Sequence, residues 1–270
     1  MANLSITTAW NETTSFVRRE AGLILPIALL LIALPGAALQ LAMPAPPPGE
    51  AAEPGLWMLL LPVVMAASMV GTVAISFLAL RPGTSVGEAL QLGLRRFIIL
   101  FAAWLLLALG LAIVLLPLIL LFAGSAAFSG TADPAALAGP MLLAFLIFAM
   151  LAIALWVRLM LMVPVAAAEA VGPIGIIRRS WELTGGHFWK LLGLVVLLVI
   201  LAVVVLVAIS AVVGIFVIVA AGQPEPGGAA FFAIVIVSAL LQSLISAFFV
   251  TLVARIYAQL AGPVDADVFA

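Results

Sequence analysis

Six long apolar stretches account for most of this chain of 270 residues. A hydrocarbon core about 30 Å thick requires roughly 20 apolar residues in a helix, and each stretch reaches that length. Because a backbone in lipid must satisfy its own hydrogen bonds, each stretch is predicted to be a transmembrane helix. The predicted spans cover residues 23–43, 56–80, 97–122, 141–163, 188–221 and 229–259.

The composition excludes a water-soluble fold. Hydrophobic residues make up 67% of the chain and charged residues 8%, with a mean hydropathy of +1.43. Such a chain could not cover a soluble domain with polar surface. It has no cysteine, which excludes disulfides and thiolate chemistry. We expect an all-α polytopic membrane bundle forming a single domain over 1–270, with its first span retained rather than cleaved as a signal peptide.

The charges separate strongly along the chain. The alternate loops at 44–55, 124–139 and 222–228 contain acids and no base. All ten basic residues lie at the opposite ends of the apolar stretches: Arg18, Arg19, Arg81, Arg95, Arg96, Arg158, Arg178, Arg179, Lys190 and Arg255. Because short basic loops stay on the cytoplasmic side, we expect an inner-membrane protein with both termini in the cytoplasm. The net charge of −1 gives no indication of nucleic-acid binding.

The order of segments suggests three repeats. Amphipathic segments at 4–17, 85–95 and 173–184 each precede an outgoing span, an acidic loop and a returning span. Residues of the first unit match the third at a constant offset, with Trp10 and Thr13 corresponding to Trp181 and Thr184, whereas the middle unit follows only the pattern. We predict hairpin repeats at 4–80, 84–163 and 172–260, each preceded by a cytoplasmic interfacial helix. All three would enter from the same side, unlike the inverted repeats of many transporters.

Arg158 is the most unusual charged residue, because it lies within an apolar run. A guanidinium in lipid costs roughly 3 kcal/mol or more, so it should face protein, water or headgroups. Glu169 follows about three helical turns later and would share its helix face if Pro164 does not bend the chain. One hypothesis is a buried pair, or an anionic-headgroup clamp formed by Arg158, Arg255, Arg178 and Arg179. The alternative is an arginine that snorkels to the membrane boundary, with Glu169 in a structural ion pair.

Two of the returning spans have polar stripes. The stripes occur at helical spacing and consist of Ser68, Thr72 and Ser76 in one span and Ser238, Gln242 and Ser246 in the other. They could line a hydrophilic interior. They could equally be hydrogen-bonding contacts between closely packed helices, with Gly71 allowing close approach. Neither stripe contains the carboxylate or lysine that a proton relay would need.

The sequence contains no constellation of residues that identifies a reaction. His187 is the only histidine and lies beside Phe188 and Trp189, where an apolar stretch begins. It is either a pH-sensitive or catalytic imidazole or an anchor in the aromatic belt of the membrane interface. No phosphate-binding glycine loop or metal-spaced ligands accompany it. We expect no cofactor and no bound metal.

Several motifs resemble a known bacterial family. They are RLMLMVP at 158–164, EAVGP at 169–173, IRRSWELT at 177–184 and FWK at 188–190, and the segment 82–97 is similar to the family's second repeat. The family is the membrane domain attached to some glycerophosphoryl diester phosphodiesterases, with related stand-alone six-helix proteins. In the enzyme members a separate soluble barrel performs hydrolysis, and this sequence contains no such barrel. The resemblance therefore implies the architecture and an association with lipids, not the phosphodiesterase activity.

These observations favour a non-catalytic bacterial inner-membrane protein. We expect it to associate with membrane lipids, including anionic phospholipid, or to act as an envelope scaffold for a membrane-protein partner. The alternative is a transporter or channel for a small or amphipathic solute, which would need a continuous polar path. An intramembrane enzyme would require His187 to meet Glu169 or Glu182 in space.

Overall fold

A computed structural model describes residues 4–44, 53–128, 134–221 and 228–262. All regular secondary structure in these ranges is helical, which confirms the all-α prediction. Six segments are long and apolar enough to cross a membrane. They are Ile6–Ala42, Leu56–Leu80, Val86–Pro117, Phe145–Ala168, Phe188–Val217 and Ala229–Ala261. This is the architecture of a multi-pass integral membrane protein.

The first hairpin begins with an irregular helical path. Ser5 caps α1 (Ile6–Ala28) by accepting the Thr8 N–H, and the helix bends at Glu20, whose φ of −105° and ψ of 16° are not helical. A π-helical turn, η1 (Leu29–Ala33), leads into α2 (Leu34–Ala42). It lies between Pro26 and Pro35, both of which lack the N–H that a regular helix needs. The chain returns through the 3₁₀ turn η2 (Leu56–Leu59) and α3 (Leu60–Leu80).

The second hairpin begins with one very long helix. Ser85 and Glu88 cap α4 (Val86–Phe128) reciprocally, each backbone N–H bonding to the other's side chain. The chain then forms α5 (Pro134–Leu159) and the short α6 (Met162–Ala168). The separate helix α7 (Pro173–Gly185) precedes the third hairpin, α8 (Phe188–Ala221) and α9 (Ala229–Ala261).

The three predicted interfacial segments differ in structure. Only the third is a separate helix, α7, because a turn at Gly186 and His187 interrupts the helix before α8 begins. The first joins its span through the bend at Glu20. The second is continuous with its span in α4, where no glycine or proline interrupts residues 94–97. The predicted fourth span also differs, because α5 ends at Leu159 and α6 begins at Met162.

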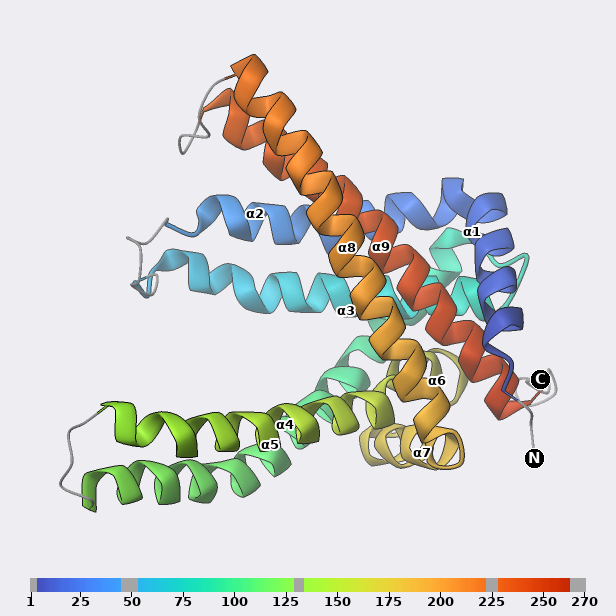
Figure 1. Ribbon diagram of the computed structural model, residues 1–270. Helices are drawn as coiled ribbons and strands as arrows, with labels where there is room; N and C mark the ends of the chain where they lie inside the picture. Colours follow the sequence, from blue (N-terminus) through green and yellow to red (C-terminus); the bar gives the residue numbers. More distant parts are fainter. Residues whose placement is uncertain (1–3, 45–52, 129–133, 222–227, 263–270) are drawn as a thin grey trace.

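The hairpins spread from a common end. Figure 1 shows α2 with α3, α4 with α5, and α8 with α9 extending in three directions away from the region of α1, α6 and α7. The two described ends of the chain meet in that region, where the Ser5 N–H donates to Gln259 Oε1 at 3.1 Å. The protein core therefore lies at one end of the hairpins, and their loop ends diverge.

The core is formed by the final parts of the returning helices. Buried residues concentrate in 70–79 of α3, 161–168 of α6 and 251–257 of α9, and each of these helices contacts the other two. Around this centre, α1 packs on α9, α4 on α3, and α7 on α5 and α6. Each predicted interfacial segment thus packs against the returning helix of the hairpin before it, and the first segment packs against that of the third hairpin. This order supports the three-repeat hypothesis, which stays a prediction.

Two glycines set the closest approaches between helices. A Cβ at Gly93 of α4 would lie 2.7 Å from the Val70 carbonyl oxygen of α3. A Cβ at Gly71 would lie 2.9 Å from Leu31 Cβ in η1. Both distances are below van der Waals contact, so these crossings require the absence of a side chain.

Candidate functional site

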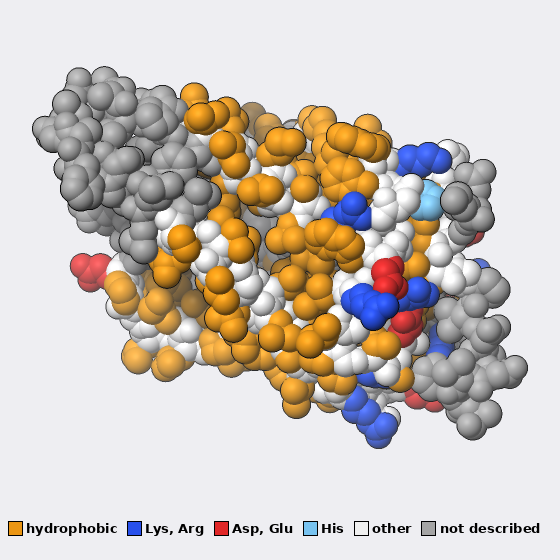
Figure 2. Space-filling model, turned by 90° about the horizontal axis from the view of Figure 1, so that it is seen from below, with side chains coloured by type: hydrophobic (Ala, Val, Ile, Leu, Met, Phe, Trp, Pro, Cys, Tyr) orange, Lys and Arg blue, Asp and Glu red, His pale blue; other side chains and the backbone are white. Residues whose placement is uncertain are grey.

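Charged side chains gather at the end where the hairpins meet. Figure 2 shows one face of the molecule, with Lys and Arg side chains and most of the visible acids at one end of it. Hydrophobic side chains cover much of the remaining coloured surface. We call the charged region the basic end, defined by the positions of Arg18, Arg95, Arg158, Arg178 and Arg255 and their neighbours at the same helix ends. Candidate binding residues from the sequence lie here on several different helices.

Arg158 lies in the last turn of α5 and stacks on aromatic rings. Its Cζ is 5.1 Å from the Trp181 ring centroid and 5.2 Å from that of Phe188. Nη1 donates a long 3.5 Å hydrogen bond to the Trp181 carbonyl. The Arg158 carbonyl accepts from Ser180 Oγ at 2.8 Å and from Thr184 Oγ1 at 3.3 Å. Backbone and side chain together fasten α5 to α7 and to the start of α8.

The expected pairing of Arg158 with Glu169 does not form, because the helix breaks between them. Glu169 ends α6 in an extended conformation, so it does not share a helix face with Arg158. Its Oε1 instead accepts from Arg179 Nε at 3.0 Å and from the Tyr257 hydroxyl at 2.7 Å. The hydrogen bond from Arg179 to Glu169 raises the pKa of Arg179 above its usual value and so keeps it a guanidinium cation. Glu169 therefore forms a structural ion pair that joins α7 to α9.

The other two arginines of the predicted clamp contact side chains of different kinds. Arg178 Nε lies 2.8 Å from Glu182 Oε1 in an exposed pair on one face of α7. Arg255 Cζ lies 5.1 Å from the Phe16 ring of α1, and its buried Nε has no hydrogen-bond partner. The contacts of Arg255 are thus with α1, while those of Arg158 are with α7 and α8. Arg158, Arg178 and Arg179 thus lie on or against α7, whereas Arg255 stacks on α1, and the clamp stays a prediction.

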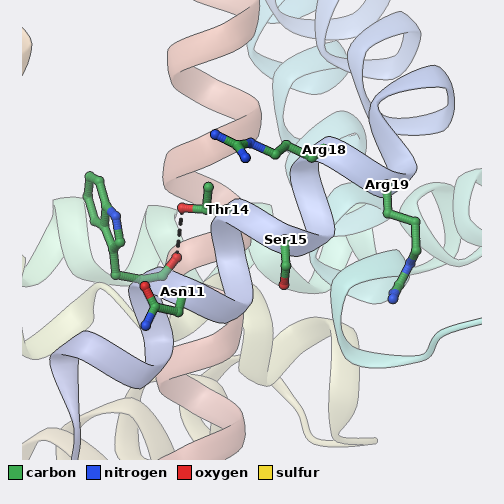
Figure 3. A pocket seen from close by; sticks show the side chains of 6 residues that line it. Asn11, Thr14, Ser15, Arg18 and Arg19 are labelled. Atoms are coloured by element: carbon green, nitrogen blue, oxygen red, sulfur yellow. Dashed lines mark hydrogen bonds between the residues drawn. The ribbon is translucent and has the colours of Figure 1, made fainter.

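A recess on α1 offers a different site. It has a volume of about 560 Å³ and is lined by Trp10, Asn11, Thr14, Ser15, Arg18 and Arg19. Figure 3 shows that the Arg18 side chain extends past Thr14, whereas Arg19 points in another direction. Arg19 Nε is 2.9 Å from Glu20 Oε1, but Arg18 makes no hydrogen bond or ion pair with the described residues. The sequence marked Arg18 only as one of the basic residues at the helix ends, not as a binding residue.

The residues of the two polar stripes differ in burial and in their contacts. Thr72 donates to the carbonyls of Ser68 and Met69 in its own helix, and Ser76 is buried. Ser238 and Gln242 of α9 are exposed, and Gln242 Nε2 lies 3.5 Å from Ser246 Oγ. Ser238 also lines a cavity of about 70 Å³ between α8 and α9. Within the described ranges no hydrogen bond joins the two stripes, and the Thr72 contacts fit the interpretation of structural packing.

His187 lies in the turn between α7 and α8, where its backbone N–H donates to the Thr184 carbonyl at 3.2 Å. Its imidazole makes no hydrogen bond or ion pair with Glu169 or Glu182. In the part of the chain that the structure describes, no three His, Asp or Glu side chains lie together as a metal site would require.

Comparison with known proteins gives one match. The model of a family described as a domain of unknown function (DUF7847) matches residues 4–260. No curated protein and no solved structure matches the chain. The family match extends from the capped start of α1 almost to the end of α9. The chain therefore belongs to the DUF7847 family.

Proposed function

We propose that this is a non-catalytic, lipid-associated membrane protein that holds phospholipid between its hairpins. The observation that carries the proposal is that two outgoing helices, α4 and α8, are each exposed over more than a full turn. In α8, the consecutive residues 203–208 are all apolar and all exposed. In α4, residues 108–114 are likewise exposed without interruption. A helix turn takes about 3.6 residues, so each run includes exposed residues on every side of its helix.

This exposure changes along the same helix. Near the basic end of α8, Leu191, Leu194 and Val195 are buried against the core. Beyond them the helix loses most of its protein neighbours, while its side chains stay apolar. Within a hydrocarbon core such side chains are covered by acyl chains, including on the faces turned toward another hairpin. Lipid between the hairpins would then cover the apolar side chains there, as neighbouring helices cover them at the basic end.

The wider setting of the proposal comes from the sequence. The confinement of basic residues to one end supports an inner-membrane location with both termini in the cytoplasm. The resemblance to membrane domains of glycerophosphoryl diester phosphodiesterases supports a role near phospholipids. The basic end would then contact anionic headgroups, and organising lipid there would suit an envelope scaffold.

The test is lipid retention after extraction. The protein is purified in a neutral detergent, exchanged extensively, and measured by native mass spectrometry before and after treatment with a stronger delipidating detergent. We expect folded protein to retain phospholipid through the exchange, to lose thermal stability on delipidation, and to regain it on adding phospholipid. Folded, lipid-free protein with unchanged stability would contradict the proposal.

A further inference from the structure

The first part of α1 is held rigidly against α9. Ala9, Thr13 and Phe16 are buried on its inner face. The Trp10 ring packs edge-on against Phe248 of α9, with centroids 4.9 Å apart. Arg255 stacks on Phe16 from the same helix α9. Trp10 both packs against α9 and lines the recess, so the recess lies along α1 next to its contact with α9.

The recess contains hydrogen-bond donors that no described residue uses. The Thr14 and Ser15 hydroxyls each donate at 2.9 Å to carbonyls of their own helix. The Asn11 amide, the Trp10 indole N–H and the Arg18 guanidinium make no hydrogen bond within the described chain. Arg18 is exposed and carries a positive charge. The recess residues without a hydrogen-bond partner in the described chain are therefore two that can donate an N–H, Trp10 and Asn11, and the cation Arg18.

This arrangement suits an anion with several acceptor oxygens. A guanidinium can donate two parallel hydrogen bonds to a phosphate, and a nearby amide can add another. The carboxylate of Glu20 is already paired with Arg19, which leaves Glu12 as the acid on this part of α1 without an ion pair. Arg19 is paired with Glu20, so Arg18 is the recess cation without an ion pair in the described chain, and a phosphodiester carries the single negative charge that matches it.

The position of the recess indicates where the phosphate comes from. It lies at the basic end, directly before the bend at Glu20 where the chain turns into its first span. Beyond that bend, Leu23, Leu30 and Leu34 are exposed apolar side chains along α1, η1 and α2. A phosphate in the recess would thus have an apolar surface on the same helical path for its acyl chains.

We propose that the α1 recess binds the phosphate of a phospholipid headgroup, with Arg18 as the cation and Asn11 and Trp10 as further donors. This inference rests on the proposed function for the lipid source of the phosphate. It assigns that function a site on α1, in place of the clamp of Arg158, Arg178, Arg179 and Arg255.

The experiment measures binding of dioctanoyl phosphatidylglycerol to the full chain in neutral, phosphate-free detergent by native mass spectrometry. Arg18→Gln is compared with Arg95→Gln, which removes the same charge from an exposed arginine at the basic end that lines none of the described pockets. Loss of a charged hydrogen-bonding group should weaken binding by roughly tenfold or more in Arg18→Gln. Arg95→Gln should bind as the parent does. Asn11→Ala should show a smaller loss.

The outcomes separate this site from the proposed function. Equal losses in both arginine variants, or none in Arg18→Gln, would overturn the site even if the parent protein retains bulk lipid. Displacement of the lipid by equimolar inorganic phosphate would overturn the lipid assignment in favour of free phosphate. Arg18-dependent binding in a protein that retains no lipid on extraction would support the site and contradict the proposed function. Circular dichroism of each variant confirms that folding is unchanged.

Discussion

At the scale of single residues, the charged groups of the basic end divide into those with partners and those without. Arg158 stacks on two rings, and Glu169 joins Arg179 and Tyr257. The sequence identified Arg158 and Glu169 as unusual, because charges next to apolar runs are costly. It did not identify their partners, since Tyr257 lies 88 residues after Glu169 in the chain. Only the packing of α9 beside α6 and α7 brings these residues together.

The Glu169 contact should contribute measurably to stability. Tyr257 is buried, and its hydroxyl donates to a carboxylate, which makes the hydrogen bond charge-assisted. We expect Tyr257→Phe to lower the free energy of unfolding by about 1–2 kcal/mol. Arg178→Gln is the control, because the Arg178–Glu182 pair is 80% and 47% exposed and should contribute less than about 0.5 kcal/mol. Unfolding in mixed micelles, followed by circular dichroism, measures both; equal effects would refute the assigned role of Glu169.

At the scale of helices, close crossings decide how the second hairpin joins the first. Gly93 lets α4 approach the backbone of α3, and the continuous helix then leads into its span. Amphipathic periodicity predicted the helix over 85–95 but not its continuity with the span. Periodicity indicates which face is apolar, whereas the bend at Glu20 and the break after α7 depend on local backbone conformation.

The crossing can be tested with two glycines of the same helix. Gly93→Ala would place a Cβ 2.7 Å from a backbone carbonyl oxygen, which cannot move as a flexible side chain can. We expect it to destabilise the protein by about 1–3 kcal/mol despite the better helix propensity of alanine. At Gly87 an added Cβ meets nothing within 4 Å, so Gly87→Ala should be neutral or slightly stabilising. Thermal unfolding in detergent distinguishes the two variants, and a neutral Gly93→Ala would show that the crossing relaxes.

At the scale of the whole molecule, packing is concentrated at one end. The returning helices meet at the basic end, while residues 108–114 of α4 and 203–208 of α8, farther along their hairpins, are all exposed. Figure 1 shows the hairpins diverging from that end. The protein therefore combines a packed end with three divergent hairpins. This arrangement is the basis for proposing that lipid occupies the space between them.

The predicted orientation can be tested in cells, because a chain without cysteine accepts unique labels. Ser15 is exposed at the basic end, and Glu53 is exposed near the opposite ends of the hairpins. We expect a membrane-impermeant maleimide to label Glu53→Cys in intact cells and Ser15→Cys only after permeabilisation. Labelling of Ser15→Cys alone in intact cells would reverse the orientation. Labelling of both cysteine variants after permeabilisation is the control that each cysteine can react with the maleimide.

The helical class, the number of spans and the segregation of charge could all be predicted from the amino-acid sequence, because each depends on composition and spacing along the chain. The sequence also indicated close packing at Gly71. The three-dimensional structure was needed to find the partners of Glu169, the rings on which Arg158 and Arg255 stack, and the exposure of Arg18 in a recess. These depend on contacts between residues far apart in sequence and on bends such as that at Glu20. A pattern within one helix does not specify which other helix will cover it.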